Sequence, residues 1–129
     1  MDIQSWGWVA LGGMAGACFR FGVSTFVQTR LGPEAMFPWG TLLINTTGSL
    51  AIGVVIGLLA GRPLDQAWRL VLVTGFLGGY TTFSAYSFEV VSLLQAQRWG
   101  FAAIYAASST FLGVAGCGIG FWVSHLFNP

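Results

Sequence analysis

The stretch GGYTTFSAYS, residues 78–87, stands in the middle of a chain that is otherwise strongly apolar. Two glycines, which weaken a helix, are followed by six hydroxyl side chains placed around one phenylalanine, Phe83. Unsatisfied polar groups are costly in hydrocarbon, so they gather where protein or water can satisfy them. The stretch therefore predicts an interrupted helix, and its surroundings decide what the interruption is for.

The composition predicts that these surroundings are a lipid membrane. Of 129 residues, 55% are hydrophobic and 7% are charged, and the mean hydropathy is +0.74. A soluble domain needs a charged surface, and this chain has five arginines, four acids and no lysine to build one. The net charge of +1 gives nucleic-acid binding no electrostatic support.

No pattern of reactive side chains points to an enzyme. Cys18 and Cys117 lie inside apolar runs, where cysteine is typically a small buried side chain, and His125 is the only histidine. No Cys, His, Asp or Glu residues have the spacing of metal ligands. The residues before the first apolar run carry Asp2 but no Lys or Arg, so we expect no cleavable signal peptide.

Four apolar stretches, each about 20 residues or longer, account for most of the chain. We place the spans near residues 5–28, 39–60, 68–95 and 100–126, within a single membrane domain over residues 1–129. Tryptophan, which favours the membrane–water interface, marks the ends of these stretches. The tryptophans are Trp6, Trp8, Trp39, Trp68, Trp99 and Trp122. The predicted fold class is an all-α membrane protein with four transmembrane helices per chain.

The arginines near the span ends do not favour either orientation of the chain in the membrane. Arg62 and Arg69 fall on the side of the N-terminus, and Arg30 and Arg98 fall on the opposite side. Because positive residues fix the orientation, this balance predicts dual topology and an antiparallel homodimer about an axis in the membrane plane. The alternative is a weak bias that neighbouring lipids or the free amine resolve.

Small residues recur at close spacing on three spans and allow helix backbones to touch. They are Gly12, Gly13 and Gly16; Ser49, Gly53 and Gly57; and Gly116 and Gly120. Packing within one subunit and packing between two subunits explain these rows equally well.

Polar and aromatic side chains form stripes on three of the four spans. The stripes are Thr41, Asn45 and Ser49; Phe83 and Tyr86, with Thr81, Ser84 and Ser87; and Tyr105 and Ser109. Hydrogen bonding between helices explains any one stripe alone. Three stripes that converge beside a broken helix favour a permeation path.

The interruption in the third span is expected at Gly78-Gly79, because glycine is unfavourable in a helix interior. Carbonyls freed at such a break can coordinate a cation, and the N-terminus of the following half-helix favours an anion. Asn45 would offer amide hydrogens to the anion, and Phe83 and Tyr86 would offer the positive edges of their rings. A path with donors but little fixed charge suits an ion that must be dehydrated without being trapped.

Two charged residues lie within the spans. Arg20 is in the first span and Glu89 is in the third, so they form either a structural ion pair or part of an electropositive vestibule. No acid lies deep in the first span. This absence counts against a proton-coupled cation exporter.

Three motifs closely resemble the Fluc (CrcB) fluoride channels. They are GFLGGYTTFSAYSFE (75–89), GTLLINTTGS (40–49) and GGMAGACFR (12–20), and the resemblance extends over all four spans. It implies a passive channel that exports fluoride accumulated when HF enters an acid-stressed microbe, with chloride excluded. It further implies an antiparallel homodimer with two pores in a bacterial inner membrane, with a central structural sodium ion held by the backbone carbonyls of Gly78 and Thr81 from both subunits.

The resemblance also implies which residues line the anion path. In the family these are an asparagine and a phenylalanine of the pore, polar residues of the fourth span, and the charged residues of the first and third spans. Together with the stripes, it assigns to the path Asn45, Phe83, Tyr86, Ser84, Ser87, Tyr105, Ser109, Thr41, Arg20 and Glu89. This chain departs from the family pattern with a tyrosine at Tyr86, and with Gly113 and Cys117 where hydroxyl residues are expected.

Two other functions remain open from the sequence. A small dual-topology drug/proton exporter shares the size and the four spans, but it predicts an essential membrane-buried acid. A non-transporting structural membrane subunit predicts that substitutions in the stripes change stability and leave ion flux unaltered.

Overall fold

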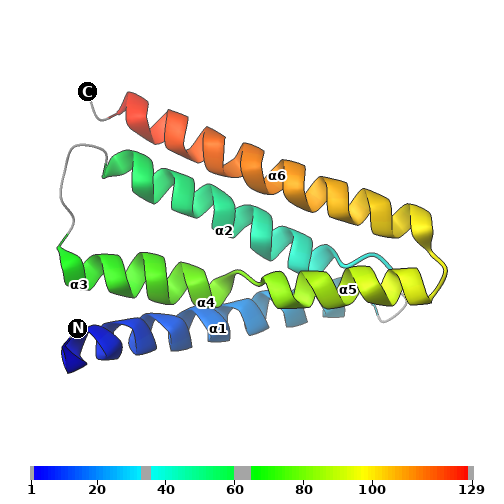
Figure 1. The fold of residues 1–129 in the computed structure, drawn as a ribbon, viewed down its shortest axis with the longest axis horizontal. Helices are drawn as coiled ribbons and strands as arrows, with labels where there is room; N and C mark the ends of the chain where they lie inside the picture. The colour runs from blue at the N-terminus through cyan, green and yellow to red at the C-terminus, as the bar shows by residue number, and fades with distance from the viewer. Residues whose placement is uncertain (1, 33–35, 60–64, 128–129) are drawn as a thin grey trace.

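The computed structural model describes residues 2–32, 36–59 and 65–127, and these residues form four roughly parallel rods (Figure 1). The rods begin and end close to the predicted spans, although residue 60 lies outside the described residues. The elements are α1 (Ile3–Leu31), α2 (Trp39–Leu58), α3 (Gln66–Arg69), the π-helix η1 (Leu70–Leu77), α4 (Gly78–Tyr80), α5 (Phe83–Gln95) and α6 (Trp99–Leu126). Elements α3 to α5 follow one another along the third rod (Figure 1).

Local capping groups fix where several of these helices begin and end. The Asp2 carboxylate accepts a hydrogen bond from the Ser5 N–H at 3.1 Å and starts α1. Asp65 does the same for α3 through the Ala67 N–H at 2.8 Å. Gly32, with a φ of 77°, ends α1 in a conformation that side chains disfavour. Both N-caps stand at the end of the bundle that holds the two chain termini (Figure 1).

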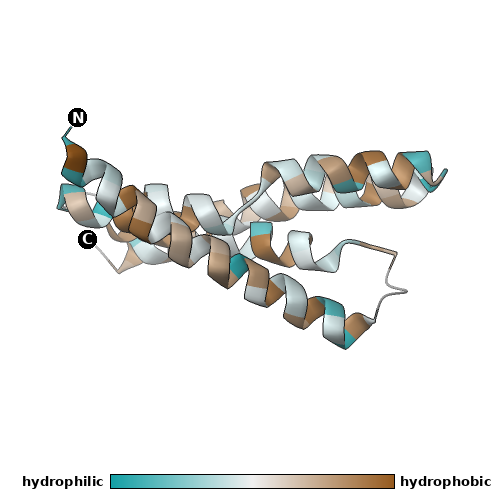
Figure 2. Cartoon of the chain, turned by 90° about the horizontal axis from the view of Figure 1, so that it is seen from below, coloured by the Kyte–Doolittle hydropathy of each residue, from teal (hydrophilic) through white to brown (hydrophobic). Residues whose placement is uncertain are grey.

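Among the described residues, three helices are long and apolar enough to cross a membrane: α1, α2 and α6. Large apolar side chains cover their outer surface, and Phe111 on α6 is 72% exposed. Figure 2 shows apolar residues along the rods, with hydrophilic residues mostly near the ends. The buried cluster is small and consists of Leu42, Leu93, Ala102 and Tyr105. Such an apolar exterior fits a protein that is surrounded by lipid.

At several glycines, the backbones of neighbouring rods come into direct contact. A Cβ on Gly12 would overlap the Val71 carbonyl, so α1 lies directly against η1. A Cβ on Gly120 would likewise overlap the Leu50 carbonyl, which joins α6 to α2. We call these contacts the glycine seams. They show that Gly12 and Gly120 serve packing within one chain.

Other small residues belong to the same two seams. Residues whose added Cβ would meet backbone of a neighbouring rod include Gly16, Gly53, Gly57, Gly75 and Gly79. Of the two explanations that the sequence leaves open for the small residues, packing within the subunit therefore holds for most of them.

The predicted interruption of the third rod is confirmed, but it lies at Thr81 and Thr82 rather than at Gly78-Gly79. Both glycines are helical, whereas Thr81 (φ −79°, ψ 156°) and Thr82 (φ −149°, ψ 116°) are extended. A Cβ on Gly79 would lie 2.6 Å from the Gly13 carbonyl, so this glycine permits close approach of α1. Intrinsic helix weakness therefore does not locate the break.

Candidate ion pathway

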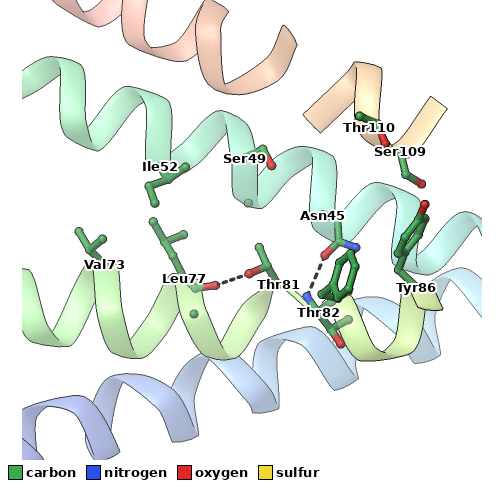
Figure 3. A pocket seen from close by; sticks show the side chains of 13 residues that line it. Asn45, Ser49, Ile52, Val73, Leu77, Thr81, Thr82, Tyr86, Ser109 and Thr110 are labelled. Carbon is green, nitrogen blue, oxygen red and sulfur yellow. Dashed lines mark hydrogen bonds between the residues drawn. The ribbon is translucent and has the colours of Figure 1, made fainter. Parts of the chain in front are cut away.

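A groove opens beside the break, between α2, the third rod and α6 (Figure 3). We call it the central groove, and its volume is ≈ 460 Å³. Its lining consists of Asn45, Gly48, Ser49, Ile52, Val73, Leu77, Gly78, Thr81, Thr82, Phe83, Tyr86, Ser109 and Thr110. None of these lining residues carries a formal charge. The groove therefore offers hydroxyls, an amide, carbonyls and rings in an apolar setting.

Asn45 on α2 holds the break in place. Its Oδ1 accepts the Thr82 N–H at 2.8 Å (Figure 3). Its Nδ2 donates to the Thr82 carbonyl at 3.0 Å. One side-chain amide thus satisfies both backbone groups of an extended, buried residue. A primary amide has two N–H donors, so one Asn45 hydrogen remains for another acceptor.

This arrangement releases two backbone carbonyls of the third rod. In a continuous helix the Thr82 N–H would donate to the Gly78 carbonyl, and the Ala85 N–H would donate to the Thr81 carbonyl. Instead, the Thr82 N–H donates to Asn45, and the Ala85 N–H donates to the Thr82 hydroxyl at 3.2 Å. Gly78 and Thr81 both line the central groove.

A row of aromatic rings leads away from the break. Phe83 and Tyr86 have ring centroids 5.5 Å apart, and Tyr86 and Tyr105 have centroids 5.4 Å apart. Tyr105 then meets Phe37 edge-on at 5.5 Å. Phe83 is 78% exposed on the single chain, whereas Tyr105 is fully buried. The row thus begins at an open surface of the subunit and continues into its core.

Glu89 lies beyond this row and accepts two hydroxyls. The Thr41 hydroxyl donates to Oε1 at 2.7 Å, and the Tyr105 hydroxyl donates to Oε2 at 2.6 Å. Thr41 and Glu89 both line a second groove of ≈ 840 Å³, the end groove, together with Arg98. Tyr105 therefore connects the aromatic row to the wall of the end groove.

The predicted pathway residues divide between the two grooves and other places. Those that line the central groove are Asn45, Phe83, Tyr86 and Ser109, and those that line the end groove are Thr41 and Glu89. Tyr105 joins the two regions.

Besides Tyr105, three predicted residues line neither groove: Arg20, Ser84 and Ser87. Ser87 donates to the Phe83 carbonyl of its own helix at 2.9 Å, and Ser84 shares a hydrogen bond of 3.2 Å with Thr82. Among the described residues there is no ion pair between Arg20 and Glu89, so the structural pairing that the sequence allows is not formed. In a single chain, these three side chains are not brought to a groove.

Two features of the site are not predicted by the sequence patterns. Thr82 caps α5 and lies at the centre of the break, and a threonine just before an apolar helix is the one local signal for this role. Thr47 on α2 and Tyr80 on α4 share a hydrogen bond of 2.8 Å. No spacing rule connects residues on two different helices, so this contact is visible only in the structure.

Sequence similarity to known proteins identifies the family of this chain. The family model described as CrcB-like protein, Camphor Resistance (CrcB), matches residues 7–121. Curated relatives bear the name fluoride-specific ion channel FluC. The relative from Novosphingobium aromaticivorans is 47% identical over 112 residues, covering 87% of this chain and 89% of its own length.

Relatives from other bacteria agree. A protein of that name from Thermus thermophilus is 44% identical over 114 residues, covering 88% of each chain. That from Acidobacterium capsulatum is 42% identical over 119 residues, covering 92% of this chain and 94% of its own length. These names describe channels, in line with the expectation that the chain is not an enzyme. The chain belongs to the CrcB family and is an integral, multi-pass membrane protein.

Proposed function

We propose that the chain is a fluoride-selective channel that lets cytoplasmic fluoride leave passively across the bacterial inner membrane. The observation that carries this proposal is the central groove, where a helix break, hydroxyls and two aromatic rings meet without a formal charge. The names of the relatives support fluoride as the permeant ion. A small anion loses its water there and receives hydrogen bonds, but no fixed cation traps it.

The aromatic row and Asn45 have distinct parts in this proposal. Phe83 and Tyr86, whose ring centroids lie 5.5 Å apart, would offer the electropositive edges of their rings to a passing anion. Asn45 positions the break through Thr82 and retains one amide hydrogen for the ion. Tyr86 adds a phenol hydroxyl to the central groove, which supplies a further donor.

We also propose that two copies assemble in opposite orientations and hold a sodium ion between them. The exposed ring of Phe83, beside the break, is the surface that the second copy would cover. The Gly78 and Thr81 carbonyls are released from helical bonding and are hard oxygen donors, which suit sodium. Two oxygens from each subunit would give four ligands. The ion, when bound, would neutralise the carbonyl dipoles and join the subunits.

The charge distribution supports dual topology. Arg69 lies at the end of the bundle that holds the termini, and Arg30 and Arg98 lie toward the other end. Arg62 falls outside the described residues. With both ends positively charged, neither orientation is strongly preferred.

Ion efflux from liposomes that contain the purified protein tests the channel proposal. We expect rapid fluoride efflux and no comparable chloride efflux, each read with an ion-selective electrode. Phe83→Ile removes the aromatic edge and should reduce fluoride efflux about tenfold or more, as expected for loss of a contact worth at least about 1.4 kcal/mol. Tyr86→Phe keeps the ring and separates the role of the hydroxyl from that of the edge.

Other results would favour the alternatives. Folded wild-type protein that moves neither ion would support a structural subunit. Transport that depends on a proton gradient and moves organic cations would support a drug exporter. Intact flux in Phe83→Ile would refute the aromatic wall while leaving the channel assignment in place.

A further inference from the structure

Several hydroxyl side chains within the helices donate to the backbone of their own helix. Serine and threonine in a helix typically donate to the carbonyl one turn earlier. Residues that do so here include Thr47, Ser87, Ser92, Thr110 and Ser124. A helical hydroxyl that does not donate in this way is free for another acceptor.

Ser49 and Ser109 are two such residues, and both line the central groove. The Ser109 hydroxyl is buried and has no hydrogen-bond partner among the described residues. Ser49 is half-buried, and its hydroxyl makes no hydrogen bond to any residue that the structure describes. A buried hydroxyl without a partner, such as that of Ser109, costs about 1–3 kcal/mol, so a ligand beside Ser109 would recover the missing bond.

The two hydroxyls come from facing helices, Ser49 from α2 and Ser109 from α6 (Figure 3). Gly113 stands one turn beyond Ser109 on α6, and a Cβ built there would lie 3.5 Å from the Ser49 Oγ. Within the described part of the chain, no other atom of a neighbouring helix lies within 4 Å of such a Cβ. The Ser49 hydroxyl therefore occupies the space beside a position of α6 that has no side chain.

We propose that Ser49 is an ion-binding residue of the central groove and donates a hydrogen bond to the anion together with Ser109. Position 113 of α6 is a glycine and has no hydroxyl, and in this chain the Ser49 hydroxyl of α2 takes its place. The inference rests on the proposed function, because it assigns a further ligand to the same permeating anion. The ligand class is a small, dehydrated anion that accepts hydrogen bonds.

Moving the hydroxyl from α2 to α6 tests this assignment by fluoride efflux from liposomes. Ser49→Ala removes one hydrogen bond to an ion and should lower the efflux rate about tenfold. The double variant Ser49→Ala with Gly113→Ser returns a hydroxyl to the same space from the opposite helix. It should restore efflux to within about threefold of wild type, since the new Cβ meets no backbone of a neighbouring helix.

Ser108→Ala is the matched control, because the Ser108 hydroxyl donates to the Tyr105 carbonyl at 3.2 Å and lines neither groove. Its efflux should equal that of wild type. Each variant is first checked for monodisperse elution in detergent. If Ser49→Ala does not fold, Ser49→Cys keeps the shape with a weaker donor and should also slow efflux.

The outcomes separate this inference from the proposed function. Wild-type protein without fluoride efflux would refute the channel itself. Efflux in Ser49→Ala equal to that of a conducting wild type would overturn only the role of Ser49. A slow Ser49→Ala that Gly113→Ser fails to rescue would also overturn it, because the loss would then arise from packing.

Discussion

The glycine seams and the break at Thr81–Thr82 show two opposite uses of residues that disfavour helices. In the seams, Gly12 and Gly120 remain helical and bring backbones into contact. At the break, two threonines leave the helix although threonine is a better helix former than glycine. The difference is the partner: a glycine faces another backbone, whereas Thr82 faces the amide of Asn45. Contacts with another rod, rather than intrinsic propensity, thus set the local conformation.

The largest effect expected from this comparison comes from filling a seam. Gly120→Ala would place a Cβ against the Leu50 carbonyl of α2 and should cost about 3 kcal/mol or more, because backbone cannot move aside easily. Thermal unfolding in detergent measures the loss of stability. Gly118→Ala is the matched control, since a Cβ there has nothing within 4 Å, and it should gain about 1 kcal/mol from helix propensity. Equal effects of both substitutions would contradict the seam.

A smaller loss is expected from removing the clamp on the break. Asn45→Ala leaves the N–H and the carbonyl of Thr82 without their partner, so we expect about 2 kcal/mol of destabilisation. Fluoride efflux should fall at the same time, because the break loses its fixed position. Melting temperature and efflux are measured on the same preparation.

Ser49→Ala provides the comparison for this variant. Ser49 is one turn further along α2 and makes no bond to the break, so its substitution should slow efflux while leaving the melting temperature near that of wild type. If Asn45→Ala kept the wild-type melting temperature, Asn45 would not hold the break.

The smallest effect concerns the link between α2 and α4. Tyr80→Phe removes the hydroxyl that shares a hydrogen bond with Thr47 and should cost about 1 kcal/mol. The Thr47 hydroxyl keeps a partner in the Leu43 carbonyl at 2.7 Å, which limits the loss. A double-mutant cycle with Thr47→Val on thermal unfolding isolates the pair. Strictly additive losses would show that the two hydroxyls do not stabilise each other.

Much of the fold is predictable because it follows from apolarity and length. The span expected at 100–126 is observed as α6 (Trp99–Leu126), and the span expected at 39–60 is observed as α2 (Trp39–Leu58). The stripe of Thr41, Asn45 and Ser49 points to one face because helical spacing fixes it. Each of these side chains lines one of the two grooves.

The remaining details of the site depend on pairs of residues far apart in the chain. Asn45 and Thr82 are separated by 37 positions, and Thr47 and Tyr80 by 33. The row of Thr81, Ser84 and Ser87 follows helical spacing, yet Thr81 is extended and the Ser87 hydroxyl donates to its own helix. A spacing rule cannot tell whether a hydroxyl is occupied by backbone or free for an ion.

Residue order alone is enough to predict that the chain lies in a membrane and crosses it four times, because these properties follow from the transfer of side chains between water and lipid. The low helix propensity of glycine predicts an interruption of the third span, although not its position. Packing of the rods was needed to place the break at Thr81 and Thr82 and to set Gly79 against α1. Packing also leaves Ser49 in the groove with a hydroxyl that has no hydrogen-bond partner among the described residues. These outcomes depend on which groups of neighbouring rods come within hydrogen-bonding or van der Waals distance, and that is settled only when the rods pack.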